Sequence, residues 1–403
     1  SPSPSPSPGP SPSPSPSPSP APSPGTVTYK PGDLTVTTNI GLTLSTGLTA
    51  KIIATKGTKV QYADGSQSTA NFHGAPDAGA VFAKPNWETD GWVYVSNSEV
   101  GSGGGGVGAI TFNAAGEVTD YKMVLTGTSR NCGGGKTPWG TWLTCEENGD
   151  AGQVWECDPF GAATFLPQQT VVGGTGGNFE SVAYDNRDPL NPHFFVTDDS
   201  SYGAVRRFSP DPSAVASGVS AAILTTSGVT KFLVVTPADT SGNTGTFEWV
   251  DSQSAGDASA NAHFPYSEGI DHRDGKLYFV SKTRKLLYIL YLDEGTYERS
   301  STVSGAFGNQ PDQILTLVGQ DGILYFCEDG GSRCGVHGRN AAGQFFTILD
   351  GDGTYSTEST GLAFSPDRKH MYVSFQGPGH IYDITREDGY AFDGQSLDIK
   401  YHA

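Results

Sequence analysis

Short runs of apolar, β-branched and aromatic residues recur along most of the chain, separated by clusters of Gly, Asp, Asn and Ser. Runs of this kind with turn-forming residues between them predict β-strands joined by tight turns. No long stretch has the helical period, and no apolar run reaches the length of about 18 residues that a membrane-spanning helix needs. The pattern therefore predicts an all-β protein.

One strand pattern, ending in small or acidic residues and followed by a second strand, recurs six times. The copies lie at residues 92–99, 141–148, 193–200, 276–282, 323–330 and 370–377. Their starts are about 50 residues apart, except for one longer interval that also holds two further strand candidates, KFLVVTPAD and GTFEWVD. Such a repeat is typical of a β-propeller, so six copies predict a six-bladed β-propeller. A pair of β-sandwiches is the alternative, but sandwiches do not require one unit to recur.

The first 24 residues have a different pattern, with proline at every even position from Pro2 to Pro24 and serine at most odd positions. Proline fixes φ and removes a backbone N–H, so this segment cannot enter a helix or an inner strand. The remaining conformation is polyproline II, which rises about 3.1 Å per residue. We therefore expect an extended arm at residues 1–24 and a propeller at residues 25–403.

The alternating Ser-Pro arm resembles the hydroxyproline-rich glycoproteins of plant and green-algal extracellular matrix. This resemblance implies hydroxylated prolines, O-linked glycans and an extracellular location. A long arm also reaches a neighbouring copy, and a head-to-tail contact that does not close propagates a filament. The positions expected to serve glycosylation and self-assembly are Pro2, Pro4, Pro6, Pro8, Pro12, Pro14, Pro16, Pro18, Pro20 and Pro24. The chain begins at Ser1 without a leader, which we expect of a processed, secreted form.

The charge balance is strongly acidic. The chain has 24 Lys and Arg against 42 Asp and Glu, a formal net charge of −18. That charge repels nucleic-acid phosphates and anionic membrane surfaces, and it makes cations the natural partners. Solubility of an extracellular protein is the alternative explanation of the same excess.

Five cysteines occur: Cys132, Cys145, Cys157, Cys327 and Cys334. The last two flank a Gly-rich turn and could close a small loop, and Cys132 could pair with Cys157 if their strands are neighbours. One cysteine is then left over. A metal thiolate, an intermolecular bridge and a buried thiol are all open to it, and the arithmetic alone favours the buried thiol.

Acidic residues stand in several units at the strand ends that a propeller would bring together around its axis. They are Glu99, Glu146, Glu147, Glu180, Glu268 and Asp312. Carboxylates a few ångströms apart raise each other's pKa, and hard cations with oxygen ligands, Ca²⁺ first, relieve that repulsion. Solvated turn residues are the alternative.

The stretch NCGGGKTPWGTWLTCEEN, residues 131–148, closely resembles the core motif of the PhoX-type alkaline phosphatases. Five further motifs follow the order of that family. They are SNSE at 96–99, NFESVAYD at 178–185, SEGID at 267–271, QPDQI at 310–314 and GLAFSPDRKHMYVSFQGPG at 361–379. The resemblance implies a six-bladed propeller whose axial site holds two iron ions and calcium, with a cysteine thiolate on iron.

Carried over residue by residue, the resemblance makes Cys145 the thiolate ligand of Fe³⁺. The resemblance also implies that seven further residues supply the oxygen ligands of iron and Ca²⁺. They are Glu99, Asn131, Glu146, Glu147, Glu180, Glu268 and Asp312. Metals at such a site bind phosphate oxygens and stabilise the charge that develops as an ester bond breaks.

Two functions from different classes follow from these features. Tyr266, Ser267 and Glu268 stand where the family has a phosphate-holding arginine. Together with the Ser-Pro arm, this favours a secreted glycoprotein that assembles head-to-tail into an extracellular fibre or matrix layer. The alternative is a metal-dependent extracellular phosphatase or phosphodiesterase. A carbohydrate-binding or scavenging propeller without assembly is a third possibility.

Overall fold

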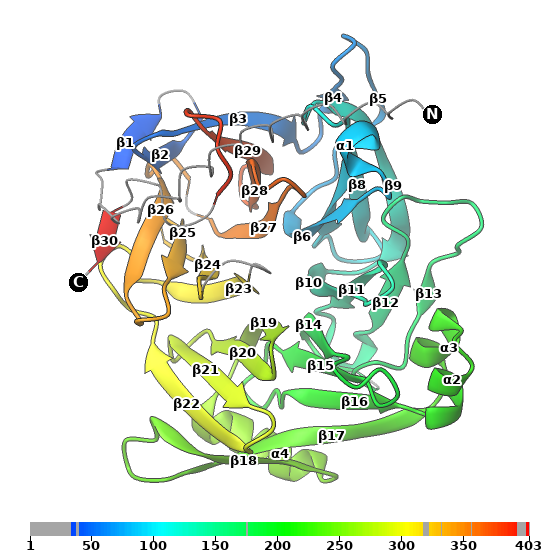
Figure 1. The fold of residues 1–403 in the computed structure, drawn as a ribbon, viewed down its shortest axis with the longest axis vertical. Coiled ribbons are helices and arrows are strands. Elements are labelled where there is room, and N and C mark those ends of the chain that lie inside the picture. The colour runs from blue at the N-terminus through cyan, green and yellow to red at the C-terminus, as the bar shows by residue number, and fades with distance from the viewer. Residues whose placement is uncertain are drawn as a thin grey trace, which may run out of the picture.

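Six blades surround a central axis in the computed structural model (Figure 1). The structure describes residues 34–37, 40–174, 176–316, 322–331, 333–355, 357–392 and 400–402. The predicted all-β class and six-bladed propeller are confirmed. The Ser-Pro arm lies outside the described residues.

The first three blades follow the chain in order. Blade 1 consists of β6 (Pro76–Ala83), β7 (Trp92–Ser98), β8 (Gly105–Phe112) and β9 (Val118–Thr128). Blade 2 consists of β10 (Asn131–Lys136), β11 (Trp142–Glu146), β12 (Val154–Cys157) and β13 (Gln168–Gln169). Blade 3 consists of β14 (Phe179–Asp185), β15 (His193–Asp198), β16 (Arg206–Pro210), β17 (Gly228–Pro237) and β18 (Thr244–Val250).

The last three blades repeat the same order. Blade 4 consists of β19 (Ser267–Arg273), β20 (Lys276–Ser281), β21 (Leu286–Tyr291) and β22 (Thr296–Ser301). Blade 5 consists of β23 (Gln310–Thr316), β24 (Leu324–Asp329), β25 (Gly335–Arg339) and β26 (Phe345–Gly351). Blade 6 consists of β27 (Ser359–Phe364), β28 (His370–Phe375), β29 (His380–Arg386) and β3 (Leu48–Thr55).

Strand β3 closes the ring, because this N-terminal segment pairs antiparallel with β29 near the C-terminal end of the chain. The first strands of neighbouring blades contact one another all the way round, from β6 to β27 and back to β6. Blade 5 is widened by β1 (Leu34–Thr37), β2 (Leu42–Ser45) and β30 (Lys400–His402). The two strand candidates in the long interval are β17 and β18, and β18 pairs with β22 of blade 4.

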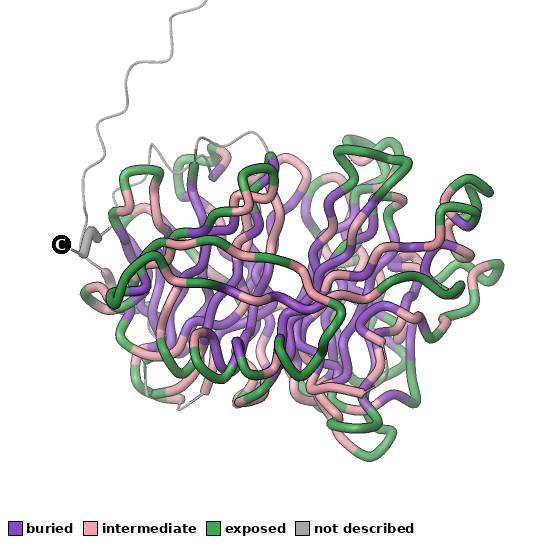
Figure 2. The backbone as a smooth tube through the Cα atoms, turned by 90° about the horizontal axis from the view of Figure 1, so that it is seen from below, coloured by how far each residue is buried: buried purple, intermediate pink, exposed green. Residues whose placement is uncertain are grey.

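Six hydrophobic clusters fill the spaces between successive blades. Between blades 6 and 1, for example, Trp92 donates its indole N–H to the Tyr372 hydroxyl at 3.0 Å, and both side chains are fully buried. Seen from the side, buried residues run along the strands and exposed residues gather in the loops at the two faces (Figure 2). The blades are therefore held by apolar packing, which leaves the axis free for polar side chains.

The remaining described elements lie outside the first strands of the blades. They are the hairpin of β4 (Lys59–Gln61) and β5 (Gln67–Asn71), the helices α1 (Trp87–Asp90), α2 (Pro212–Ala216), α3 (Ser220–Thr225) and α4 (Gln253–His263), and a 3₁₀ turn at Gly149–Ala151. Ser252 caps the start of helix α4, because its hydroxyl accepts a hydrogen bond from the Ala255 N–H at 3.3 Å. No helix among the described residues has the length and apolar character needed to cross a membrane.

All five cysteines are free thiols in the structure. Neither the Cys327–Cys334 pair nor the Cys132–Cys157 pair forms the disulfide that the sequence suggested. Cys327 and Cys334 instead lie in the apolar cluster between blades 5 and 6, where burial favours the neutral thiol.

Candidate metal centre

A first ring of side chains comes from the start of the first strand of each blade. Every one of these six strands has an irregularity in its pairing register near that end. Such bulges turn a side chain away from the regular alternation of a strand. The side chains at these positions are Asp77, Cys132, Glu180, Glu268, Asp312 and Thr360.

A second ring comes from the end of the second strand of each blade. Its members are Glu99, Glu147, Asp199, Lys282, Asp329 and Gln376. Five of them make the same backbone contact, since each N–H donates to the carbonyl of the residue that precedes the first strand of its blade, at 2.7–3.3 Å. Three of those preceding residues, Ala75, Arg130 and Tyr266, have positive φ angles of 41°, 52° and 55°. Strained backbone of this kind is concentrated at functional sites.

Asp77 is the centre of a hydrogen-bonded group on one side of the axis. Its carboxylate accepts bonds from the Thr360 hydroxyl at 2.8 Å, the Gln376 amide at 3.0 Å and the Cys132 thiol at 3.4 Å. The Gln376 amide also donates to Glu99 at 2.7 Å. Candidate ligand atoms of Asp77, Glu99 and Cys132 all lie within 4.8 Å of one another, which is close enough for a shared cation.

Glu180, Glu268 and Asp312 form a second group, also with candidate ligand atoms within 4.8 Å of one another. All three side chains are buried. Next to them lies Lys282, whose Nζ is 2.8 Å from Glu268 Oε1 and 3.1 Å from Asp329 Oδ2.

Burial disfavours the charged forms of these acidic groups. It raises the pKa of Glu99 to about 8 and that of Glu147 to about 7, and repulsion from neighbouring carboxylates adds to both shifts. Burial and like charges also hold the pKa values of Glu180, Glu268 and Asp312 well above the ordinary range. In the absence of a bound cation, these groups therefore hold protons more tightly than ordinary carboxyl groups do, although the Lys282 charge opposes the shift at Glu268.

The chemistry of this donor set fits hard cations. Each ring contributes four carboxyl groups, and Lys282 is the one ammonium among the ring members. Asp199 Oδ1 is buried and has no hydrogen-bond partner within the described parts of the chain. Carboxylate oxygens are preferred ligands of Ca²⁺, and a thiol next to them adds a softer donor suited to a transition metal. The residues present thus fit a centre of more than one metal ion.

Five of the eight residues predicted as metal ligands meet at this centre. They are Glu99, Glu147, Glu180, Glu268 and Asp312. Asn131 and Glu146 have other partners. Asn131 bonds to the hydroxyls of Thr128 and Thr144, and Glu146 accepts from the Ser129 N–H and the Trp155 indole.

Cys145 lies in the apolar cluster between blades 2 and 3, packed with Leu143, Val154 and Phe179. Burial raises the pKa of its thiol. Cys132 is the cysteine that the structure brings beside carboxylates. Sequence reasoning also missed Asp77, Asp199, Lys282 and Asp329, although the last three occupy the same column as Glu99 when the six repeats are aligned.

A sequence model of the family described as Alkaline phosphatase PhoX matches residues 88–179. The comparison with curated proteins finds no match. Among solved structures, Pseudomonas fluorescens PhoX in complex with vanadate, a transition state analogue, has a TM-score of 0.68 and 16% identity, covering 91% of this chain and 99% of that one. Virginiamycin B lyase from Staphylococcus aureus has a TM-score of 0.44 and 14% identity over 90% of this chain and 96% of that one.

The family-model match and the fold likeness to Pseudomonas fluorescens PhoX make this chain a β-propeller similar to PhoX. The resemblance to the PhoX-type alkaline phosphatases is confirmed, by sequence over residues 88–179 and by fold over most of the chain.

Proposed function

We propose that this protein is a metal-dependent hydrolase of phosphoric esters. The observation that carries the proposal is the pair of rings around the axis, in which eight carboxyl groups and the Cys132 thiol converge within a PhoX-like propeller. A fold that needed only stability would not gather so many buried acidic groups, since each one disfavours the metal-free folded state when it ionises.

Asp77, Glu99 and Cys132 would hold one cation, and Glu180, Glu268 and Asp312 would hold another. When bound, Ca²⁺ and Fe³⁺ supply positive charge for phosphate oxygens and lower the pKa of a coordinated water. Cys132 takes the thiolate role that the sequence resemblance gave to Cys145, because the Cys132 thiol lies 3.4 Å from the Asp77 carboxylate, whereas Cys145 lies in an apolar cluster.

The other groups at the centre position these ligands. Gln376 bridges Asp77 and Glu99, and the Thr360 hydroxyl fixes the second oxygen of Asp77. The Arg130 charge lowers the pKa values of Glu99 and Glu147, although burial dominates both shifts. Arg130 is exposed, so its guanidinium is also accessible to an anionic substrate.

A chromogenic phosphomonoester and a phosphodiester test the proposal on the purified full chain. We expect release of product that stops after chelation and returns with Ca²⁺ and Fe³⁺. Cys132→Ala abolishes it, whereas Cys145→Ala retains the metals and at least part of the activity. Absence of hydrolysis from metal-loaded protein, or loss of metal only in Cys145→Ala, would contradict the proposal.

Assembly through residues 1–24 stays a prediction, as do O-linked glycans on the arm and the extracellular location. These residues lie outside the described part of the chain. Comparing particle size by light scattering before and after deletion of residues 1–24 tests the assembly role. A shortened chain that still forms filaments would rule out the arm as the connector.

A further inference from the structure

The sixfold repeat gives Lys282 an unusual place. At the equivalent position, four blades carry a carboxylate, Glu99, Glu147, Asp199 or Asp329, and one carries the amide of Gln376. Blade 4 alone carries a basic residue there. Where its neighbours offer an oxygen to a cation, this blade offers a cation.

The backbone at Lys282 is fixed by its surroundings. Its N–H donates to the Tyr266 carbonyl at 2.8 Å, and its own carbonyl accepts from the Lys285 N–H at 3.1 Å. The preceding Ser281 hydroxyl donates to the Pro265 carbonyl at 2.7 Å. Any rearrangement at Lys282 therefore involves its side chain rather than its backbone.

Three carboxylates from three blades surround the ammonium group. Nζ lies 2.8 Å from Glu268 of blade 4, 3.1 Å from Asp329 of blade 5 and 3.5 Å from Asp199 of blade 3. The Lys282 side chain is 22% exposed and that of Glu268 only 2%. An ion pair this deep is much less screened by water than a surface pair.

We propose that Lys282 is a built-in counter-cation that competes with a divalent metal ion for Glu268, and so sets the concentration at which this half of the centre binds metal. The inference rests on the proposed function, in which Glu268 is a metal ligand. It adds a specific role for a residue that offers no ligand atom to a metal while it is charged.

Competition follows from charge. An ammonium 2.8 Å from Glu268 Oε1 already neutralises that carboxylate, and its positive charge repels a metal ion that approaches the same group. Binding of a metal ion at Glu268 therefore competes with the Lys282–Glu268 ion pair. Without metal, the same ion pairs offset the repulsion between Glu268, Asp199 and Asp329 and favour the folded state.

Because Lys282 both competes with metal and stabilises the metal-free fold, one substitution should change metal affinity and metal-free stability in opposite directions. Lys282→Met removes the competitor, so metal affinity rises, but it leaves three carboxylates uncompensated, so the metal-free protein becomes less stable. If Lys282 were purely structural, Lys282→Met would lower the stability with and without metal and would leave the metal affinity unchanged or reduced.

The experiment is a Ca²⁺ titration by calorimetry on the chelated full chain, combined with thermal unfolding with and without Ca²⁺. We expect Lys282→Met to bind Ca²⁺ at least about tenfold more tightly, because one unit of opposing charge is removed. Its melting temperature falls without Ca²⁺ and reaches or exceeds that of the unmodified protein with Ca²⁺. Lys282→Gln, which retains a hydrogen-bond donor, gives an intermediate affinity and serves if Lys282→Met does not fold without metal.

Lys285→Met is the matched control, since Lys285 Nζ donates to the Gly308 carbonyl at 2.6 Å rather than to a carboxylate. We expect its Ca²⁺ affinity to be unchanged. Equal or weaker Ca²⁺ binding by both Lys282 variants would overturn the inference, as would absence of Ca²⁺ binding from every form. Tighter binding without ester hydrolysis in any form would overturn the proposed function alone, and hydrolysis with unchanged affinity would overturn the inference alone.

Discussion

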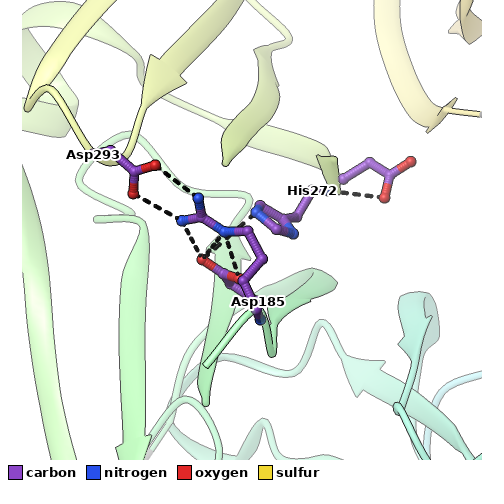
Figure 3. A network of polar contacts seen from close by, with 5 residues as sticks. Asp185, His272 and Asp293 are labelled. Carbon is purple, nitrogen blue, oxygen red and sulfur yellow. Dashed lines mark hydrogen bonds and ion pairs between the residues drawn. The ribbon is translucent and has the colours of Figure 1, made fainter. Parts of the chain in front are cut away.

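The neighbouring strands β14 and β19 carry acidic residues at both ends. The two ends differ in how far nearby cations neutralise those residues. At their starts, Glu180 and Glu268 join the acidic centre. At its end, β14 places Asp185 beside Arg187, which follows it, and beside His272 of β19. Figure 3 shows Asp185, His272 and Asp293 in this network, and Arg187 donates to both Asp185 and Asp293. Its guanidinium donates to Asp185 at 2.9–3.1 Å and to Asp293 at 2.8 and 3.1 Å.

The pKa shifts of Glu180 and Asp185, at the two ends of β14, have opposite directions. Burial raises the pKa of Glu180 far above its ordinary value, and neighbouring carboxylates raise it further. Burial also raises that of Asp185, but the hydrogen bonds and charge of Arg187 outweigh it, so the net pKa is lowered. The Asp185 end is therefore balanced by its own cation, Arg187, whereas the carboxyl groups at the Glu180 end outnumber the one ammonium beside them, that of Lys282. This contrast separates a structural polar network from a binding site.

Neutralising a carboxylate of the centre has the largest expected effect. Glu180→Gln keeps the shape of the side chain and removes its charge. We expect metal affinity to fall by about 100-fold or more and ester hydrolysis to be lost, because a ligand is removed from a site with few substitutes. Calorimetry and the phosphoester assay measure both effects.

Glu180→Gln should not destabilise the metal-free protein, because the buried group already disfavours ionisation. Thermal unfolding of the chelated variant at pH 8 checks this expectation. A lower melting temperature than that of the unmodified chain would mean that Glu180 contributes to the fold and would remove the contrast between the two ends.

The pH dependence of stability is the next largest effect. Glu99 and Glu147 have folded-state pKa values of about 8 and about 7, above their unfolded values. The folded state thus holds protons that the unfolded state releases, and the stability gained below the unfolded pKa is lost as pH rises to about 8. We expect the metal-free free energy of unfolding to fall by roughly a few kcal/mol between pH 5 and 8.

Saturating metal should flatten that decline, because it replaces the protons. Asp185 behaves in the opposite way. Its lowered pKa contributes stability above the unfolded value, and that contribution is lost as pH falls below about 4. Denaturant unfolding at several pH values, with and without metal, measures both the loss of stability at high pH and the loss at low pH. A metal-free chain with constant stability from pH 5 to 8 would contradict the raised pKa values.

The blade repeat could be predicted from sequence because each blade is a local unit. Alternation and turn residues mark four strands that pair with their neighbours in the chain. The closing strand could not be predicted in this way. Residues 48–55 pair with residues 380–386 at the other end of the chain, and no local pattern records so distant a partner.

The centre could be predicted only in part, for a similar reason. Glu99 and Glu147 stand at the ends of regular strands, where the repeat fixes their position. Asp199, Lys282 and Asp329 occupy the equivalent position of other repeats, but they lie outside the motifs that resemble the PhoX family, so those motifs did not predict them. Cys132 lies at a bulge, and the alternation of a strand does not reveal which way a bulged side chain points.

Removing Arg187, the cation beside Asp185 at the end of β14, has a moderate expected effect. Arg187→Met leaves Asp185 with His272, whose Nε2 is 3.6 Å from Oδ2. Because the Arg187 side chain is 40% exposed, we expect a loss of about 1–2 kcal/mol in the free energy of unfolding. Denaturant unfolding at pH 7 measures it. Metal affinity should stay unchanged, and a large change would show that the two strand ends are coupled.

Asp293→Asn has the smallest expected effect and tests which carboxylate partner of Arg187 contributes to stability. The Asp293 side chain is 69% exposed, so water and salt screen its pair with Arg187, whereas the Asp185 side chain is only 9% exposed. We expect a melting temperature within error of the unmodified protein at 0.15 M salt and a small decrease only at low salt. In the Arg187→Met background, the same substitution should have no further effect, because its partner is gone. If Asp293→Asn instead lowered the melting temperature as much as Arg187→Met does, the link between blades 3 and 4 would depend on the exposed carboxylate of Asp293 rather than on the buried one of Asp185.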